Sequence, residues 1–181
     1  MKATGIVRRI DDLGRVVIPK EIRRTMRIRE GDPLEIYTDK DGGVIFKKYS
    51  LMGGLADFAG QLCETLSRTA GRPTVITDRD ACIAVAGVPR REVMDKRISA
   101  ELERLMEGRQ IYQYRGGEGT IPLCADGDQY RLCVAAPILA EGDVLGCVVF
   151  AGKEEENLAG GEVDYKLAQS VAAFLGRHME N

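Results

Sequence analysis

Leu-Gly-Arg-Val-Val-Ile-Pro, at residues 13–19, is the stretch that decides the fold of the first part of this chain. The acidic pair Asp11-Asp12 precedes it, and Gly14 is free to adopt a positive φ. Acidic residues followed by glycine are typical of a turn, because short carboxylates bond to the backbone two residues on. A turn is therefore expected over 11–14.

The segments that flank this turn are expected to be extended. Residues 4–7 and 15–18 are rich in β-branched side chains and predict two short strands. Pro19 suits the first turn of a helix, where its missing N–H costs little, so a helix is predicted to follow it up to residue 26. Residues 34–38 and 44–48 are β-rich runs on either side of a Gly-containing turn and predict a hairpin.

The first fifty residues are too few to make a stable core alone. Modules of this size are marginal and often need a second copy to bury the faces of their strands. An intertwined dimer is therefore expected on physical grounds.

Charge is divided unequally along the chain. Residues 1–50 hold 12 Lys and Arg against 8 Asp and Glu, a net charge of +4, whereas residues 51–181 hold 14 against 20, a net charge of −6. Segregation of this kind indicates that a polyanion binds the basic end, while the acidic part keeps the molecule soluble. The arginines near the turn are the candidates for that contact.

The remainder of the chain is patterned as a second, larger domain. The apolar residues Leu55, Phe58, Leu62 and Leu66 recur at helical spacing, and strands and helices alternate after them. The expected helices are 55–70, 99–106 and 162–178, and the expected strands are 74–77, 82–86, 131–139 and 144–151, with a further Gly-interrupted strand within 111–123. This order predicts an α+β domain with an antiparallel sheet and helices packed on it.

The sequence predicts three parts. They are a small basic domain at 1–50 that is expected to bind DNA, a linker at 51–54 that contains a Gly-Gly pair, and a regulatory or oligomerisation domain at 55–181. No signal peptide or membrane-spanning run occurs, so the protein is expected in the cytoplasm with no membrane partner. Five widely spaced cysteines predict reduced thiols, and neither a metal site nor a cofactor is expected.

Residues 4–24 resemble the swapped-hairpin DNA-binding domain of the AbrB family of bacterial transition-state regulators, and the likeness continues through Lys48. The resemblance implies that two chains interleave their hairpins into a small β-barrel dimer that binds double-stranded DNA. It also implies recognition that tolerates changes of sequence and depends on DNA shape. A sensor-like domain after Ser50 also occurs in the family's sporulation regulators, so control of sporulation genes, by activation or repression, is implied in the same way.

The resemblance also implies which side chains meet DNA. The positions that match the family's basic face are Arg8, Arg15, Arg23 and Arg24, and Arg9 and Lys2 are neighbours that we add to them. Guanidinium groups suit this task because they are always charged and bind phosphate in a bidentate manner. The alternative is a solvated face whose arginines are paired with nearby carboxylates.

Residues 55–178 resemble a GAF domain, a fold that often holds a small effector between its sheet and its helices. The candidate pocket segments are 87–91 and 112–120. Two roles stay open for this domain, namely binding of an unknown small-molecule effector and oligomerisation alone. Helices 55–70 and 162–178 are expected either to meet their copies in a homotetramer or to cover their own sheet.

An enzyme is not expected, because the chain has one histidine, His178, and no paired nucleophile and base. Two other functions remain as alternatives to a transcription regulator. One is an antitoxin-type autoregulator, although such proteins commonly end in a disordered tail and residues 55–178 are patterned to fold. The other is a ligand sensor whose contact with DNA is secondary.

Overall fold

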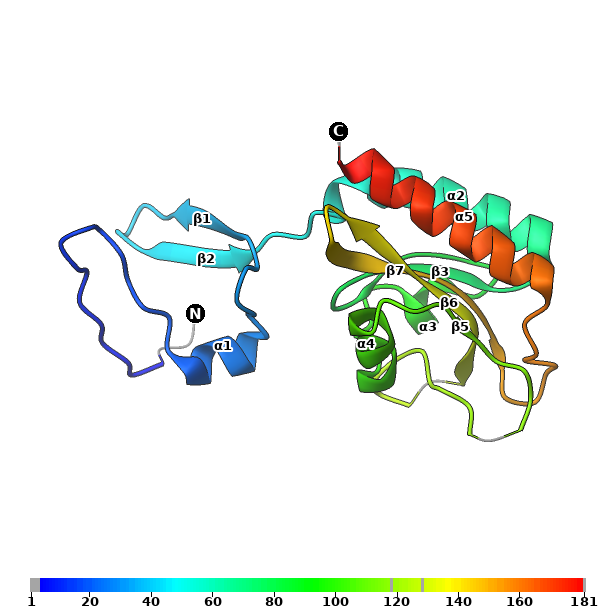
Figure 1. Ribbon diagram of the computed structural model, residues 1–181. Helices are drawn as coiled ribbons and strands as arrows, with labels where there is room; N and C mark the ends of the chain where they lie inside the picture. Colours follow the sequence, from blue (N-terminus) through cyan, green and yellow to red (C-terminus); the bar gives the residue numbers. More distant parts are fainter. Residues whose placement is uncertain (1–3, 118, 128, 181) are drawn as a thin grey trace. The chain divides into compact units, whose positions relative to one another are not determined.

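The computed structural model describes residues 4–117, 119–127 and 129–180. The chain divides into two compact units, residues 1–49 and 50–181 (Figure 1). In the part of the chain that is described, the first unit holds one helix and one hairpin, and the second holds a five-stranded sheet with its helices.

The ordered elements of the first unit are the helix α1 (Lys20–Met26) and the strands β1 (Leu34–Thr38) and β2 (Val44–Lys48). The two strands pair antiparallel, with Ile36 opposite Phe46. Asp39 closes their turn, because its Oδ1 accepts the backbone N–H of Gly43 at 2.6 Å. The helix and the hairpin that the sequence predicts after Pro19 are thus confirmed.

The strands predicted at 4–7 and 15–18 are not present in the single chain. The turn between them is as predicted: the N–H of Asp11 donates to the carbonyl of Arg15 at 3.0 Å, and Gly14 has a φ of 76°. The turn joins two arms, residues 4–10 and 15–18, and beyond the turn the two arms separate (Figure 1). A strand needs a series of backbone bonds to a neighbour. Within the described residues of one chain, the bond from Asp11 to Arg15 that closes the turn is the only backbone bond between the two sides, so this prediction is wrong for the single chain.

The first unit has almost no core. Among its described residues, Pro19 is the only one that is buried. Large apolar side chains face solvent instead: Val7 is 89% exposed, Ile10 72% and Val17 71%. Burial of apolar surface stabilises a fold by about 25 cal/mol for each Å² removed from water. The exposed arms of a single chain lack this stabilisation.

The second unit is built on one antiparallel sheet with the strand order β4-β3-β7-β6-β5. Its strands are β3 (Thr74–Asp78), β4 (Cys82–Ala86), β5 (Tyr112–Gln113), β6 (Tyr130–Ala140) and β7 (Asp143–Lys153). The long β6–β7 hairpin turns at Glu141-Gly142, where both residues have a positive φ. The α+β fold with an antiparallel sheet that the sequence predicts for this part is confirmed.

Helices cover both faces of this sheet (Figure 1). The long helices α2 (Ala56–Ala70) and α5 (Glu162–Met179) lie side by side on one face, and the short helices α3 (Arg90–Val93) and α4 (Ala100–Glu107) lie on the other. The side chains of β7 alternate accordingly, with Val148 and Phe150 packed beneath the long helices and Val149 packed on the opposite side. Each face therefore has its own core.

Two segments differ from the interpretation of the sequence. The sequence predicts a linker at 51–54, yet Met52 has no exposed surface and packs in the core with residues of α2. Residues 53–55 form a short 3₁₀ turn that leads into that helix. The helix α3 was not predicted, because its four residues are too few to show a helical period.

Two helix glycines of the second unit should respond oppositely to alanine. A Cβ at Gly176 would lie 2.0 Å from the carbonyl oxygen of Leu139, so Gly176→Ala forces α5 away from β6 and should cost about 1–3 kcal/mol. A Cβ at Gly60 meets nothing within 4 Å, so Gly60→Ala should stabilise α2 by about 0.5–1 kcal/mol. Urea unfolding of both variants measures the two signs, and a stabilised Gly176→Ala would contradict this packing of α5.

Candidate nucleic-acid interface

Arg23 and Arg24 lie in the last turn of α1, and both are exposed. The helix ends at Arg27, which adopts a left-handed conformation with a φ of 53°. In this conformation the N–H of Ile28 reaches back to the carbonyl of Arg23 at 2.8 Å and closes the helix end. Cationic side chains at this end are favoured by the negative pole of the helix dipole.

A partly buried ion pair holds α1 on the hairpin. Lys48 of β2 places its Nζ 3.4 Å from Asp32 Oδ2 and donates to the carbonyl of Arg27 at 3.0 Å. Asp32 also accepts the N–H of Arg29 at 2.8 Å, and only 4% of its side chain is exposed. The end of α1 that carries the two arginines is thereby fixed to β2.

Arg15 is held by the turn that precedes it. Asp11 Oδ1 accepts the N–H of Leu13 at 3.0 Å and the N–H of Arg15 at 2.8 Å, while Asp11 Oδ2 accepts Arg15 Nε at 2.8 Å. The bond from the backbone N–H of Arg15, followed by the one from its side chain, holds the pKa of Asp11 below its usual value. The carboxylate is therefore charged at neutral pH, and the contact is lost only as the pH falls through this lowered pKa.

The predicted interface residues lie on three elements of one chain. Arg8 and Arg9 are exposed on the first arm, Arg15 is exposed on the second, and Arg23 and Arg24 are exposed on α1. Lys2 lies outside the described residues. The sequence interpretation missed Asp11 as the partner of Arg15, although an Asp four residues before an Arg and three before a Gly is a signal for such a turn.

The start of the second unit is tied down near the sheet. Ser50 Oγ donates to Asp78 Oδ2 at 2.9 Å, and Asp78 Oδ1 accepts the N–H groups of Asp80 and Ala81, each at 2.8 Å. Together with buried Met52, this contact anchors the segment that follows β2.

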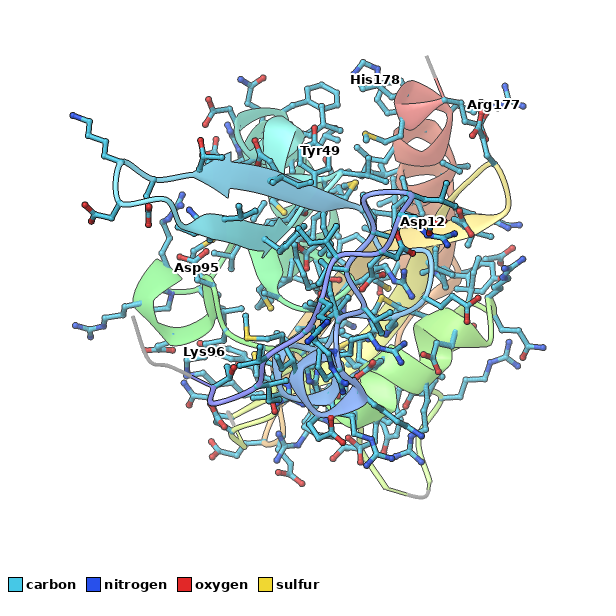
Figure 2. All side chains as sticks on the ribbon, turned by 90° about the vertical axis from the view of Figure 1, so that its left-hand side faces the viewer. Asp12, Tyr49, Asp95, Lys96, Arg177 and His178 are labelled. Atoms are coloured by element: carbon cyan, nitrogen blue, oxygen red, sulfur yellow. The ribbon has the colours of Figure 1, made fainter. Side chains whose placement is uncertain are left out.

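The outer side of α2 and α5 carries an aromatic cluster. The rings of Phe58 and Phe174 lie 6.1 Å apart, and the ring of His178 lies 5.5 Å from Phe58 and 6.1 Å from Phe174. Phe174 is half exposed and Val163 of the same helix is 68% exposed. Figure 2 shows His178 and Arg177 leaving the last turn of α5 in different directions. This apolar surface, which we call the α2/α5 face, faces outward from the sheet.

The N-terminal end of α5 is fixed by an ion pair that the sequence did not reveal. Arg72, just before β3, places its Nε 3.2 Å from Asp164 Oδ2 and donates to the carbonyls of Asn157 and Ala159 at 2.9 and 2.8 Å. The same carboxylate oxygen accepts the N–H of Gly161 at 3.0 Å. The orientation of α5, and with it the α2/α5 face, depends on this contact.

All five cysteines are buried, and none of them forms a disulfide bond. Burial raises the pKa of Cys63 to about 12 and that of Cys133 to about 11, and it raises the pKa of Cys147 as well. A nucleophilic cysteine needs a lowered pKa and access to solvent, so these thiols are packing residues in the folded chain.

Ellman's reagent should therefore react only slowly with the native protein at pH 8. In denaturant it should react readily with all five thiols. The raised thiol pKa values also make the folded state pH-dependent. The contribution of these thiols to the free energy of unfolding is complete below the usual thiol pKa of 9.0, and it is lost as the pH rises toward about 11–12. Rapid labelling of the native protein at pH 8 would contradict this burial.

Among the described residues, no helix is both long and apolar enough to cross a membrane. In the same residues, no group of three or more His, Cys, Asp or Glu side chains is placed to hold a metal ion.

Both units match known protein families. Residues 54–180 match the family described as stage V sporulation protein T C-terminal, transcription factor. Residues 7–51 match the family described as antidote-toxin recognition MazE, bacterial antitoxin. Among individual relatives, stage V sporulation protein T of Bacillus subtilis (strain 168) is 47% identical over 180 residues, which cover 99% of each chain. Transition state regulatory protein AbrB of the same organism is 46% identical over 81 residues, 45% of this chain and 82% of the relative.

The fold of the second unit recurs in distant proteins. A type II free methionine-R-sulfoxide reductase from Thermoplasma acidophilum is 12% identical, covers 69% of this chain and 94% of its own, and superposes with a TM-score of 0.50. At this identity the likeness concerns the fold alone and says nothing of reductase activity. The GAF domain of the nutrient sensor CodY from Clostridium difficile is a further match, with 14% identity, 66% and 83% coverage and a TM-score of 0.46.

The relatives confirm the family that residues 4–24 suggest. One family model covers well over half of the chain, and one relative is 47% identical along almost all of it. The chain belongs to the stage V sporulation protein T family of transcription factors, within the AbrB group of regulators.

Proposed function

We propose that this transcription factor binds double-stranded DNA through an arginine face on an intertwined dimer of its first unit, and that it regulates sporulation genes. The observation that carries this proposal is the incomplete first unit. Its two arms expose Val7, Ile10 and Val17, and among the described residues they are joined by no backbone bond beyond the one that closes the turn. A second copy supplies backbone partners, so each arm becomes a strand of a shared barrel.

The dimer doubles the number of arginines on the binding surface. Arg8, Arg15, Arg23 and Arg24 are exposed in each chain, which makes eight guanidinium groups in two chains. Contacts of this kind go mainly to phosphate, and they position the protein on the duplex without reading its sequence. Arg9, which is exposed on the first arm, is kept as a further candidate from the sequence, and Lys2 lies outside the described residues.

Arg23→Ala in the full-length protein should weaken binding to every duplex by a similar factor. Because a dimer loses two phosphate contacts, the slope of log K against log salt concentration should shrink by about 2. Fluorescence anisotropy with a promoter duplex and a random duplex measures both effects. Arg68→Ala is the matched control, since Arg68 is an exposed helix arginine of the second unit paired with Glu64 at 3.4 Å. A loss confined to one sequence would instead indicate that Arg23 reads bases.

We also propose that the α2/α5 face joins two such dimers into a homotetramer. Half-exposed Phe174 and exposed Val163 give this face an apolar surface that a second copy would cover. Phe174→Glu should convert tetramers to dimers in analytical ultracentrifugation. Gln169→Glu, which adds the same charge at an exposed position of α5 outside the apolar stripe, should leave them intact. An unchanged mass of Phe174→Glu would contradict this assembly.

Two further roles are distinguished by simple experiments. An effector that binds the second unit should raise the melting temperature of the full-length protein in a ligand screen. An antitoxin role is suggested by the MazE match, which covers the first unit only, and copurification of a small toxin from the host would support it. Against that role, residues 50–181 form a folded unit rather than a disordered tail.

A further inference from the structure

One carboxylate in the basic arms is placed where it acts on a DNA-contacting residue. Asp11 is four residues before Arg15, and its two oxygens have different tasks. Oδ1 accepts the backbone N–H groups of Leu13 and Arg15 and shapes the turn, and Oδ2 accepts Arg15 Nε at 2.8 Å. The neighbouring Asp12 makes no such contact with the described residues, although it lies in the same turn (Figure 2).

The contact uses only part of the Arg15 guanidinium. A guanidinium has five N–H groups, and Nε supplies one of them. The N–H groups of the two Nη atoms remain for a ligand on the side away from Asp11, and 70% of the Arg15 side chain is exposed. The pair therefore fixes where the charge of Arg15 is presented without occupying the edge that binds phosphate.

We propose that Asp11 is a positioning residue that sets how strongly the protein discriminates its preferred DNA from random duplex, by holding Arg15 in one presentation. This inference rests on the proposed DNA-binding function. A held guanidinium matches one spacing of phosphates across a groove, whereas a freely rotating one adapts to many. The negative charge of Asp11 also lowers affinity for DNA of every sequence. Asp11 therefore weakens binding to all DNA while it increases the preference for one duplex over another.

Asp11→Asn separates these effects. The asparagine oxygen can still accept the N–H groups of Leu13 and Arg15, so the turn is kept. Its amide group donates hydrogen bonds and cannot accept Arg15 Nε, so the guanidinium is released. Asp12→Asn is the matched control, because it removes the same charge from the same turn without releasing Arg15.

The expected result is a change in the ratio of affinities for a promoter duplex and a random duplex, measured with the full-length protein. An exposed ion pair changes an equilibrium constant by about 1.4- to 5-fold, so two chains should lower the ratio by about 2- to 25-fold in Asp11→Asn. Affinity for random duplex should rise in both Asn variants, and the ratio should stay constant in Asp12→Asn. In Asp11→Asn/Arg15→Ala the ratio should equal that of Arg15→Ala, since Asp11 acts through Arg15.

Two outcomes distinguish the failure of this inference from the failure of the proposed function. If Arg15→Ala weakens binding but Asp11→Asn and Asp12→Asn have the same ratio, Asp11 does not position Arg15 for recognition. If Arg15→Ala binds both duplexes as the wild type does, Arg15 is not a DNA contact and the proposed arginine face is itself wrong. Circular dichroism of Asp11→Asn verifies that the first unit remains folded.

Discussion

Val7→Asp should abolish the dimer and unfold the first unit, while the second unit keeps its stability. In the single chain Val7 is 89% exposed, so a charge there would cost almost nothing. In the proposed barrel Val7 alternates with Arg8 along the strand and points away from the DNA face into the shared core. Burial of an unpaired carboxylate in that core costs several kcal/mol for each chain. Residues 4–49 should lose their protection against hydrogen exchange, and DNA binding should be lost with it.

Thr4→Asp is the control for Val7→Asp. Thr4 is exposed on the same arm, and its replacement adds the same charge without removing an apolar side chain. This variant should remain a folded dimer. If Val7→Asp also kept its mass, its exchange protection and its DNA affinity, then the exposure of Val7 would be a property of the working protein, and no second copy would cover it.

The largest effect on DNA binding is expected when Arg8, Arg15, Arg23 and Arg24 are all replaced by alanine. A dimer then loses eight guanidinium groups, and the slope of log K against log salt concentration, expected near −7 if all eight contact phosphate, should approach zero. Binding at 200 mM salt should be undetectable with any duplex. Removal of like charges from one surface leaves the fold intact, so the variant should unfold at the same urea concentration as the wild type.

The control for this variant is the pair Arg68→Ala and Arg104→Ala, made together. Both arginines are exposed on helices of the second unit and pair with nearby glutamates at 3.4 Å. Their loss changes the net charge of the chain without touching the arms or α1. Retention of tight binding by the fourfold arginine variant would show that DNA contacts another part of the molecule.

Local chemistry made much of the second unit predictable from sequence. Ser99 caps α4 by accepting the N–H of Leu102 at 3.0 Å, and Gly71 ends α2 with a φ of 65°. The hairpin at β6 and β7 follows from two apolar runs on either side of Glu141-Gly142-Asp143. In each case the signal lies within a few residues of the element that it specifies.

The rest depended on partners that are distant in sequence or absent from one chain. The arms at 4–7 and 15–18 have the residues of strands, but a strand also requires a neighbour, and within one chain's described residues only the bond that closes the turn joins them. The Gly-Gly pair after Met52 predicts a linker, yet Met52 is buried in the core with residues of α2. The ion pair of Arg72 with Asp164 spans 92 positions, which no local pattern can reveal.

The sequence predicts part of the candidate site, and the structure reveals another part. The exposed arginines could be named from the sequence and its resemblance to a family, because their charge and spacing are local properties. The hold of Asp11 on Arg15 depends on which carboxylate oxygen meets which nitrogen, and this became visible only in three dimensions. How the arginines of two chains are combined into one surface is a property of the proposed dimer.

The dependence of DNA affinity on salt concentration is the most direct test of the proposed arginine face. If the arginine face of a dimer binds phosphate through six to ten contacts, the dissociation constant of the full-length protein should rise by about 10³–10⁵ between roughly 50 and 200 mM salt. The rise should be similar for promoter and random duplexes, because phosphate contacts do not read sequence. A dissociation constant that stays the same between those salt concentrations would contradict the account.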